Sequence, residues 1–523
     1  MAEKINRGEP LYAVEMSIQM TPRTVHVHPG LTPLQVRTLN HVAVERALAE
    51  AGVEHFAVRG LEDRVPVIGV RADERDAVVA ALGALARQSR AYLASIMPKP
   101  AVRDVLLDGA DDAAWGKVAD AKVLRLVWFR TDPTQTLVYG REYGCDIEFW
   151  GTARDGRLWG PRQNRVGRVL PGESTPVQAP MEQFTRLAGV GRTLPPVRTR
   201  PEMAVTLPDD ITFPIDLVYT WVDGTDPVWQ QKRAQVTGET YHAESASAAR
   251  FLSRDELRYS LRSIHANAPW IRNIYIVTDE QTPPWLDTTQ PGVRVVSHKE
   301  IFSDPTVLPV FNSHAIESQL HRIDGMAEHF LYLNDDMFFG RPMAPQAFFL
   351  ANGLSKFFLS QGRVPVGPIR VDDTPVDAAH KNNRRLLEAK FGPVTTQVFQ
   401  HVPYALRRSV MAEIEAEFPA EYTATMTSRF RSTEDLSPVS NLYHHYAFLS
   451  GRALPGSVKY GYVQLAVPDL AARLARALER RDWEAYCIND AFSTEDQLAA
   501  QDAVLRPFLD GYFPVPSPYE KQA

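Results

Sequence analysis

The chain of 523 residues contains only two cysteines, Cys145 and Cys487, and they lie far apart in the sequence. Two distant cysteines cannot build a disulfide framework or a cysteine-rich zinc site, and this fits a reducing compartment. No stretch approaches the roughly 20 apolar residues of a membrane-spanning helix, and the start, MAEKINRGEP, lacks the apolar core of a signal peptide. We therefore expect a cytoplasmic location, with peripheral association at the inner face of a membrane left open.

An excess of one charge is absent as well. The 57 lysine and arginine residues nearly balance the 63 aspartate and glutamate residues, and the net charge is −6. This argues against a protein that binds nucleic acid by neutralising phosphates along a duplex. The P-loop, the dinucleotide-binding G-x-G-x-x-G after a strand, and the hydrolase motif G-x-S-x-G are also missing, so these enzyme classes lose their main support.

A proline-rich stretch divides the chain. Residues 187–214 contain five prolines that interrupt any helical or strand period, which predicts a linker. Before it, helix-period segments and short strand-like segments predict an α+β domain over residues 1–190. We place the linker at 191–213 and a second domain at 214–523.

The second domain alternates strands and helices, which predicts an α/β fold with a mostly parallel sheet. Strands are predicted at 215–221, 273–278, 293–298 and 329–334, and helices at 254–266 and 313–327. Ser253 and Glu256 form an S-x-x-E pattern that is typical of a helix-capping box. The segments 401–418, 435–453 and 494–510 give the C-terminal third a mainly helical character.

Two polar segments follow predicted strands, where ligands bind in open α/β sheets. The first, VYTWVDGTDP, contains Trp221, Asp223 and Gly224, although an ordinary Asp-Gly turn beside a core tryptophan explains it equally well. The second, FLYLNDDMFFG, places Asp335 and Asp336 between large apolar residues. Adjacent carboxylates in such surroundings indicate a bound Mg²⁺ or Mn²⁺ better than a solvated pair.

Further candidates are weaker by themselves. Helical spacing would place Glu317 and His321 on one face, without the spacing of a zinc motif. His401 precedes Pro403, so we expect its imidazole at a helix N-terminus, where the neutral form is favoured and suits a base. Arg431 is a candidate partner for phosphate, and the short apolar run CIND ends in polar residues, Asn489 and Asp490.

Four blocks of the sequence resemble, in order, the conserved regions of the Stealth family of sugar-1-phosphate transferases, which includes bacterial capsular polysaccharide phosphotransferases. They lie near 215–227, 254–340, 401–450 and 487–520 and contain YTWVDG, LYLNDDMFFG, RFRSTED and CIND. The resemblance implies a Rossmann-like, nucleotide-diphosphosugar transferase-like sheet. It also implies transfer of a sugar-1-phosphate from a UDP-sugar to a glycan hydroxyl, with release of UMP, in capsule or exopolysaccharide synthesis.

The resemblance also implies roles for individual residues. His401 would be the base, Arg431 would neutralise the transferring phosphoryl group with Arg258 or Arg262, and Asp336 would act in catalysis as a metal ligand. Metal binding is implied for Asp335, Asp336 and Asp490. Substrate binding is implied for Tyr219, Trp221, Val222, Asp223, Gly224, Arg258, Arg262, Glu317, His321 and Asn489. Animal relatives carry a second histidine where this chain has Tyr404.

Two other functions remain open at this stage. A metal-dependent glycosyltransferase would use the same carboxylates and release UDP, and an inactive glycan-binding module would release no nucleotide.

In the N-terminal region, Asp146 and Glu148 alternate on a predicted strand. We interpret them as an outward polar face rather than a metal pair, and acceptor recognition is our hypothesis for this domain. The sequence leaves the sugar, the acceptor and the oligomeric state open.

Overall fold

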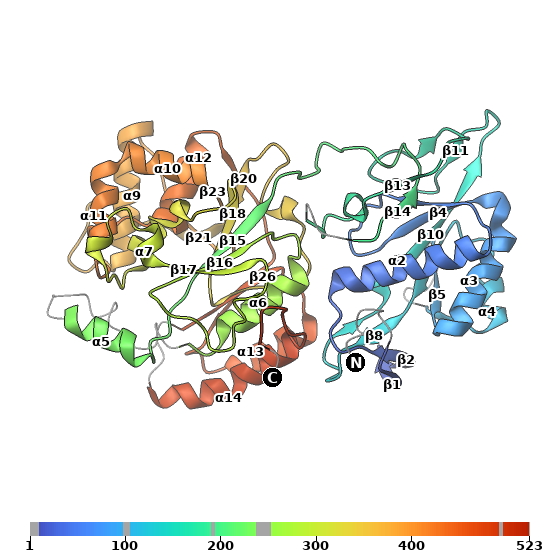
Figure 1. The fold of residues 1–523 in the computed structure, drawn as a ribbon, viewed down its shortest axis with the longest axis horizontal. Coiled ribbons are helices and arrows are strands. Elements are labelled where there is room, and N and C mark those ends of the chain that lie inside the picture. Colours follow the sequence, from blue (N-terminus) through green and yellow to red (C-terminus); the bar gives the residue numbers. More distant parts are fainter. Residues whose placement is uncertain (1–9, 98–104, 190–193, 237–252, 491–494, 522–523) are drawn as a thin grey trace. The chain divides into compact units, whose positions relative to one another are not determined.

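The computed structural model describes residues 10–97, 105–189, 194–236, 253–490 and 495–521. The chain forms two compact units, which divide between Asp210 and Ile211 (Figure 1). Residues Pro514–Pro516 belong to the first unit, and the last residues from Ser517 belong to the second. Each unit has its own hydrophobic core.

The first unit is built on a mixed β-sheet with helices α2 (Pro33–Glu50) and α3 (Arg75–Ser89). Thr32 and Gln35 form a capping box at the start of α2. Strand β10 (Cys145–Thr152) runs parallel to β4 and antiparallel to β7. The other strands include β1 (Tyr12–Ile18), β2 (Thr21–Val27), β3 (His55–Val58), β4 (Val67–Arg71), β5 (Tyr92–Met97), β7 (Val123–Val127), β8 (Phe129–Thr131), β13 (Val177–Ala179) and β14 (Val197–Thr199).

The carboxylates of β10 are buried, so the predicted outward polar face is wrong. Arg125 Nε lies 2.6 Å from Asp146 Oδ1, and Arg162 bridges both carboxylates, at 2.7 Å from Asp146 Oδ2 and 2.6 Å from Glu148 Oε1. The indole of Trp150 also donates to Glu148, at 3.2 Å. Buried carboxylates that are paired in this way need no metal ion to balance their charge.

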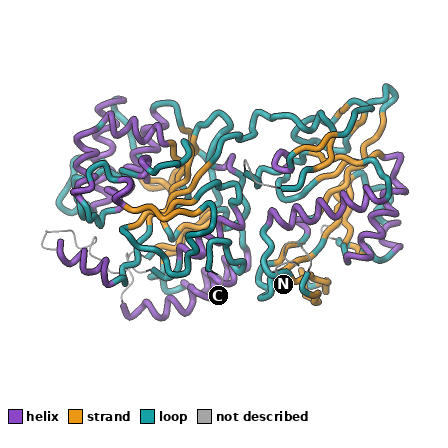
Figure 2. Tube along the Cα trace, in the orientation of Figure 1, coloured by secondary structure: helices purple, strands orange, loops and turns teal. Residues whose placement is uncertain are grey.

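The second unit contains a five-stranded sheet in the order β17-β16-β15-β18-β23. Strands β15 (Ile215–Thr220), β16 (Ile274–Thr278), β17 (Val293–Ser297) and β18 (His329–Asn334) are parallel, which confirms the four predicted strands. The apolar residues of β15, β16 and β18 are buried, as central parallel strands require, whereas the edge strand β17 is only partly buried. Figure 2 shows helices on both sides of these strands.

Helix α6 (Glu256–Asn267) packs Leu257, Leu261 and Ile264 into this core. The predicted capping box is wrong, because Asp255 is the N-cap and, in the described part of the chain, no side chain caps this helix. The carboxylate of Glu256 instead accepts the backbone N–H of Arg254 at 2.6 Å.

The predicted helix 313–327 is also wrong. Helix α8 (Ser313–Glu317) is short, and a separate 3₁₀ turn follows at Leu320–Arg322. The hydroxyl of Ser318 donates back to the carbonyl of Ala315 at 2.7 Å, and such bonds compete with the helical pattern. Glu317 and His321 therefore do not share one helical face.

A second, three-stranded sheet in the order β19-β26-β25 continues from the first. Strand β19 (Met337–Phe339) begins three residues after β18 ends, and it pairs with β26 (Ala485–Asn489), which pairs with β25 (Tyr460–Gln464). Helices α13 (Leu470–Arg480) and α14 (Glu495–Tyr512) cover this sheet.

The segment 401–418 is not one helix as predicted. Residues Tyr404–Arg407 form β23, which pairs antiparallel with β18, and α10 begins only at Arg408. The remaining helices of this part are α9 (Pro375–Phe391), α10 (Arg408–Glu417), α11 (Pro419–Thr427) and α12 (Tyr443–Leu449). Among the helices within the described ranges, none has the length and apolar character needed to cross a membrane.

Candidate active site

The acidic turn Asp335-Asp336 joins the two sheets at the carboxyl end of β18. Strand β26 fixes it, because the backbone N–H of Ile488 donates to the carbonyl of Asp336 at 3.0 Å and the Cys487 thiol lies 3.3 Å from Asp336 Oδ2. The side chain of Asn489 also hydrogen-bonds to Asp336. The buried Oδ1 of Asp336 has no hydrogen-bond partner in the described part of the structure.

Three carboxyl groups crowd around this turn, and burial together with their mutual repulsion disfavours the ionised forms. Burial raises the pKa of Asp336 to about 6, and the carboxylate of Glu256 adds to the rise, while Cys487 and Asn489 oppose it. Burial and the neighbouring Asp336 raise the pKa of Asp335, and burial and Asp335 raise that of Glu256. A cation at the turn would relieve this repulsion.

The donor set fits a divalent ion that also binds a substrate. Within the residues that the structure describes, no three His, Cys, Asp or Glu side chains form a metal site by themselves. Mg²⁺ is commonly held by one or two carboxylates, with waters and substrate phosphates as its other ligands. Asp335 and Asp336, with the unpartnered Oδ1, suit that arrangement.

Asp490, the other predicted metal ligand, is paired with a cation of the protein. Arg254 Nη2 donates to Asp490 Oδ2 at 2.7 Å and to Gln501 Oε1 at 3.0 Å. The guanidinium, which precedes α6, thus connects the end of β26 with Gln501 in α14.

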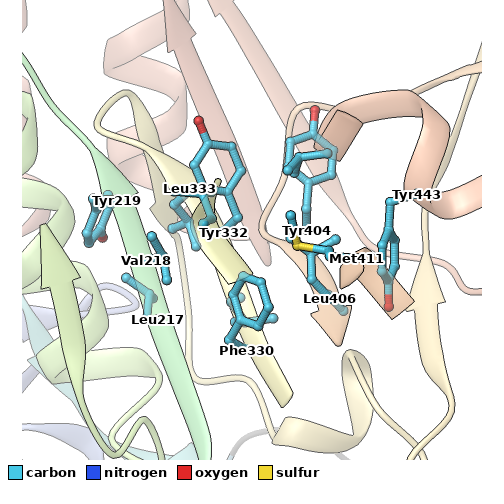
Figure 3. Packing of buried hydrophobic residues seen from close by; sticks show 14 of the residues in the cluster. Leu217, Val218, Tyr219, Phe330, Tyr332, Leu333, Tyr404, Leu406, Met411 and Tyr443 are labelled. Carbon is cyan, nitrogen blue, oxygen red and sulfur yellow. The ribbon is translucent and has the colours of Figure 1, made fainter. Parts of the chain in front are cut away.

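A buried polar network lies beside the acidic turn. The hydroxyl of Tyr332 lies 2.8 Å from Thr220 Oγ1, 2.9 Å from Asn334 Oδ1 and 3.3 Å from Glu317 Oε1. Tyr404 stacks on Tyr332 with ring centroids 6.4 Å apart, and Figure 3 shows the two tyrosines side by side on β18 and β23. Burial raises the pKa of Glu317 to about 7, against the positive charge of Arg431.

His401 precedes β23 and does not lie at a helix N-terminus as predicted, because the pairing of β23 with β18 displaces the helix to Arg408. Burial lowers the pKa of His401, and Arg431 lowers it further, so the imidazole is neutral at pH 7. Its buried Nδ1 finds no hydrogen-bond partner among the described residues. Arg431 is held by Ser313, whose Oγ lies 2.8 Å from Arg431 Nη2.

The first predicted loop is only partly available to a ligand. Tyr219 and Trp221 are buried in the core, and the hydroxyl of Tyr219 lies 2.6 Å from Ser260 Oγ. The backbone of Asp223 is held by Gln281 through bonds of 3.0 and 2.9 Å. Val222, Asp223 and Gly224 are partly exposed after the end of β15.

Three predicted substrate-binding residues have partners elsewhere in the second unit. Arg258 and Arg262 both form ion pairs with Glu520, at 2.6 and 2.8 Å, and His321 Nε2 lies 2.9 Å from Glu415 Oε2. Of the other predicted residues, Asn489 hydrogen-bonds to Asp336, and the charge of Arg431 acts on both His401 and Glu317.

Four residues of this site were not predicted from the sequence. They are Glu256, Tyr332, Cys487 and Tyr462, of which Tyr462 lies beside His401 with ring centroids 6.2 Å apart. The polar hydroxyls of LYLN and YGYVQ next to otherwise apolar strand positions were the available signal.

Comparison with known families gives the same four blocks. Stealth protein conserved regions 1, 2, 3 and 4 match residues 213–241, 250–357, 400–448 and 476–523.

Related proteins match along nearly the whole chain. An exopolysaccharide phosphotransferase of Streptomyces coelicolor is 50% identical over 527 residues, which covers 100% of this chain and 97% of the relative. The exopolysaccharide phosphotransferase CpsY of Mycobacterium tuberculosis is 35% identical and covers 99% of this chain and 94% of its own length. Among solved structures, the galactosyltransferase LgtC with donor and acceptor sugar analogues covers 58% of this chain and 96% of its own, at 10% identity and a TM-score of 0.29. The family that the motifs indicate is confirmed, and the chain belongs to the Stealth protein family.

Proposed function

We propose that the protein transfers a sugar-1-phosphate from a UDP-sugar to a hydroxyl of a glycan acceptor, with release of UMP, in exopolysaccharide or capsule synthesis. Relatives named exopolysaccharide phosphotransferases, matched over nearly their whole length, support phosphoryl transfer. The observation that carries the proposal is an acidic turn and a neutral histidine at the carboxyl end of β18, with an arginine whose charge acts on that histidine. Phosphoryl transfer depends on these groups, because it needs positioning and charge neutralisation.

Mg²⁺ or Mn²⁺ is the cofactor in this proposal, held by Asp335 and Asp336. When bound, the ion would neutralise charge on the diphosphate and on the transition state. Hydrogen bonds from Cys487 and Asn489 hold one oxygen of Asp336, so the other oxygen is left for a ligand.

The protein side chains supply the remaining steps. His401 takes the proton from the acceptor hydroxyl, whose oxygen then attacks the β-phosphorus of the donor. The bond between the β-phosphorus and the bridging oxygen breaks, and UMP leaves with that oxygen. Arg431 neutralises the charge that develops on the transferring phosphoryl group, and the hydroxyl of Ser313 holds its guanidinium through a hydrogen bond of 2.8 Å. A base of this kind contributes roughly 10²–10⁴-fold in rate.

We assign the nucleotide to the loop of Val222, Asp223 and Gly224, because it follows β15, the neighbour of β18. Residues 214–523 then form the catalytic domain, which agrees with the position of all four conserved regions. For residues 1–190 we propose an accessory role in recognising the acceptor.

The test is to identify the nucleotide that the full chain releases from UDP-glucose, UDP-galactose and UDP-N-acetylglucosamine with Mg²⁺ and an oligosaccharide acceptor. Mass spectrometry should find UMP, and chelation should abolish it. Asp336→Asn should lose release, whereas Asp324→Asn, at an exposed position, should keep it. Release of UDP would instead show attack on the anomeric carbon by a glycosyltransferase, and release of neither would leave a binding module.

A further inference from the structure

Strand β25 belongs to the site although it lies outside the conserved regions. Conserved regions 3 and 4 match 400–448 and 476–523, so residues 449–475 fall between them. Within the second sheet, however, Tyr462 of β25 is in register with Cys487 of β26, whose thiol contacts Asp336. A segment that none of the four conserved-region models matches thus borders the acidic turn.

The strand also holds the loop that carries His401. The hydroxyl of Tyr460 hydrogen-bonds to the backbone of His401. Two residues further, the ring of Tyr462 lies beside the imidazole, with centroids 6.2 Å apart and planes at 58°. Gly461 between them allows close packing on Trp483, since a Cβ at this position would collide with the indole ring. The position of β25 against His401 is therefore closely determined.

Tyr462 differs from the other rings around the site because its side chain is 44% exposed. Tyr332 and Tyr404 are buried and pack on each other. Considering only the described residues, the hydroxyl of Tyr462 forms no hydrogen bond, and burial with the nearby Cys487 raises its pKa to about 12. The phenol stays protonated at neutral pH and is free to donate to a ligand.

The sheet order indicates which ligand would meet this ring. The loop after β15 and the acidic turn after β18 lie on neighbouring strands, and the first residue of β23, Tyr404, pairs with Tyr332 of β18. His401 therefore lies on the side of the acidic turn away from the β15 loop. Tyr462, next to His401, is on the acceptor side.

We propose that Tyr462 is the surface on which a sugar ring of the acceptor stacks, and that residues 449–475 thereby help to determine which acceptor is used. A sugar ring has an apolar face of C–H groups, and an exposed aromatic ring offers it a rigid surface at little entropic cost. The assignment to the acceptor rests on the proposed function, because it uses His401 as the base.

The test compares Tyr462→Ala and Tyr462→Phe with the unchanged chain. The probes are maltotetraose, mannotetraose and chitotetraose, whose binding is measured by saturation-transfer NMR and titration without a donor. UMP binding is measured separately. Phe448→Ala is the matched control, since Phe448 is 50% exposed in the same unit and packs on Phe357. Thermal melts verify that each variant is folded.

We expect at least one oligosaccharide to bind the unchanged chain through ring C–H groups. Tyr462→Ala should weaken this binding about tenfold, which corresponds to about 1.4 kcal/mol. Tyr462→Phe should stay within about threefold, because aromatic stacking supplies most of the affinity. UMP affinity should not change, and Phe448→Ala should behave as the unchanged chain. In the transfer assay, KM for the oligosaccharide should rise while KM for the UDP-sugar stays constant.

Three results would overturn the inference. In the first, Tyr462→Ala binds the oligosaccharides as well as the unchanged chain does. In the second, Tyr462→Ala weakens the binding of UMP instead of the binding of oligosaccharides. In the third, the unchanged chain binds none of the three oligosaccharides. A different result would refute the proposed function. If the chain binds oligosaccharides through Tyr462 but releases no UMP, the sugar-binding role of Tyr462 stands and the phosphotransferase activity is refuted.

Discussion

Replacing Arg262 by alanine separates a structural role from the substrate-binding role that the sequence predicts. Arg262 is buried on α6 and donates from Nε and Nη2 to the two oxygens of Glu520, at 2.8 Å each. Its Nη1 also donates to the carbonyl of Phe513 at 3.1 Å. These bonds fasten the C-terminal segment of the second unit to α6.

The loss of stability in Arg262→Ala depends on the hydrogen bonds that the carboxylate of Glu520 would keep. Arg258 Nε and the backbone N–H of Ser517 still reach the carboxylate, at 2.6 and 2.8 Å. Removing one partner of a buried ion pair lowers the free energy of unfolding by about 3–5 kcal/mol. Because Glu520 keeps two partners, we expect Arg262→Ala to lie at the lower end, at about 3 kcal/mol. At about 2–4 °C per kcal/mol for a unit of this size, the melting temperature should fall by about 6–12 °C.

The loss should depend on pH. Burial alone would raise the pKa of Glu520, but the hydrogen bonds and charge of Arg262 hold it below its usual value. A lowered carboxyl pKa stabilises the fold above the pKa of the unfolded chain, about 4.3, and this stabilisation disappears as the pH falls through the folded pKa. The difference in free energy of unfolding between the two chains should therefore be full at pH 7 and shrink below about pH 4.

Calorimetry of the full chain measures the stability, and steady-state kinetics with a UDP-sugar measures substrate binding. Arg262→Ala with Glu520→Gln should recover part of the loss, because no buried charge is then left without its partner. An unchanged melting temperature together with a strongly raised KM for the UDP-sugar would refute the structural role and restore the sequence-based prediction.

His401→Asn should lower kcat for UMP release by about 10²–10⁴-fold at an unchanged melting temperature, and a kcat close to that of the unchanged chain would remove His401 as the base. Asp216→Ala should lower the free energy of unfolding in urea by about 3–5 kcal/mol. The reason is that the buried carboxylate of Asp216 accepts hydrogen bonds from Arg272 at 2.8 and 2.6 Å and from the backbone N–H of Ala327 at 2.7 Å. An unchanged midpoint of urea unfolding would contradict this prediction. Arg162→Ala should destabilise the first unit in a thermal melt, because the buried Glu148 loses its guanidinium partner and Asp146 keeps only Arg125, whereas Arg157→Ala in an exposed pair should not.

The parallel strands and the acidic turn could be predicted from the sequence because their signals are local. Strands β15 and β18 are mostly apolar and buried, and the carboxylates follow β18 directly. The partners of Arg258 and Arg262 have no local signal, since Glu520 lies 262 and 258 residues away in the chain. An exposed arginine pair on a helix and one that anchors a distant segment look the same in sequence.

The β23 segment shows a second reason for failure. Residues 404–407 precede a helical pattern without a break, so the sequence extends the helix backward through them. In the fold, Leu331 and Tyr332 of β18 pair with Ala405 and Tyr404, and these long-range hydrogen bonds outweigh the local preference. The error mattered for the site, because it assigned His401 to a helix terminus instead of a strand entrance.

The site is assembled from two sheets, and this explains why its members are scattered through the sequence. Strand β18 brings the acidic turn, and β23 brings the loop of His401. Strand β26 then fixes Asp336 from the other sheet through Cys487, Ile488 and Asn489. Strand β25 meets this arrangement through its pairing with β26 and through the hydrogen bond from Tyr460 to the backbone of His401. The groups that hold Asp336 all come from β26, so replacing the exposed ring of Tyr462 on β25 should leave the hydrogen bonds of the acidic turn in place.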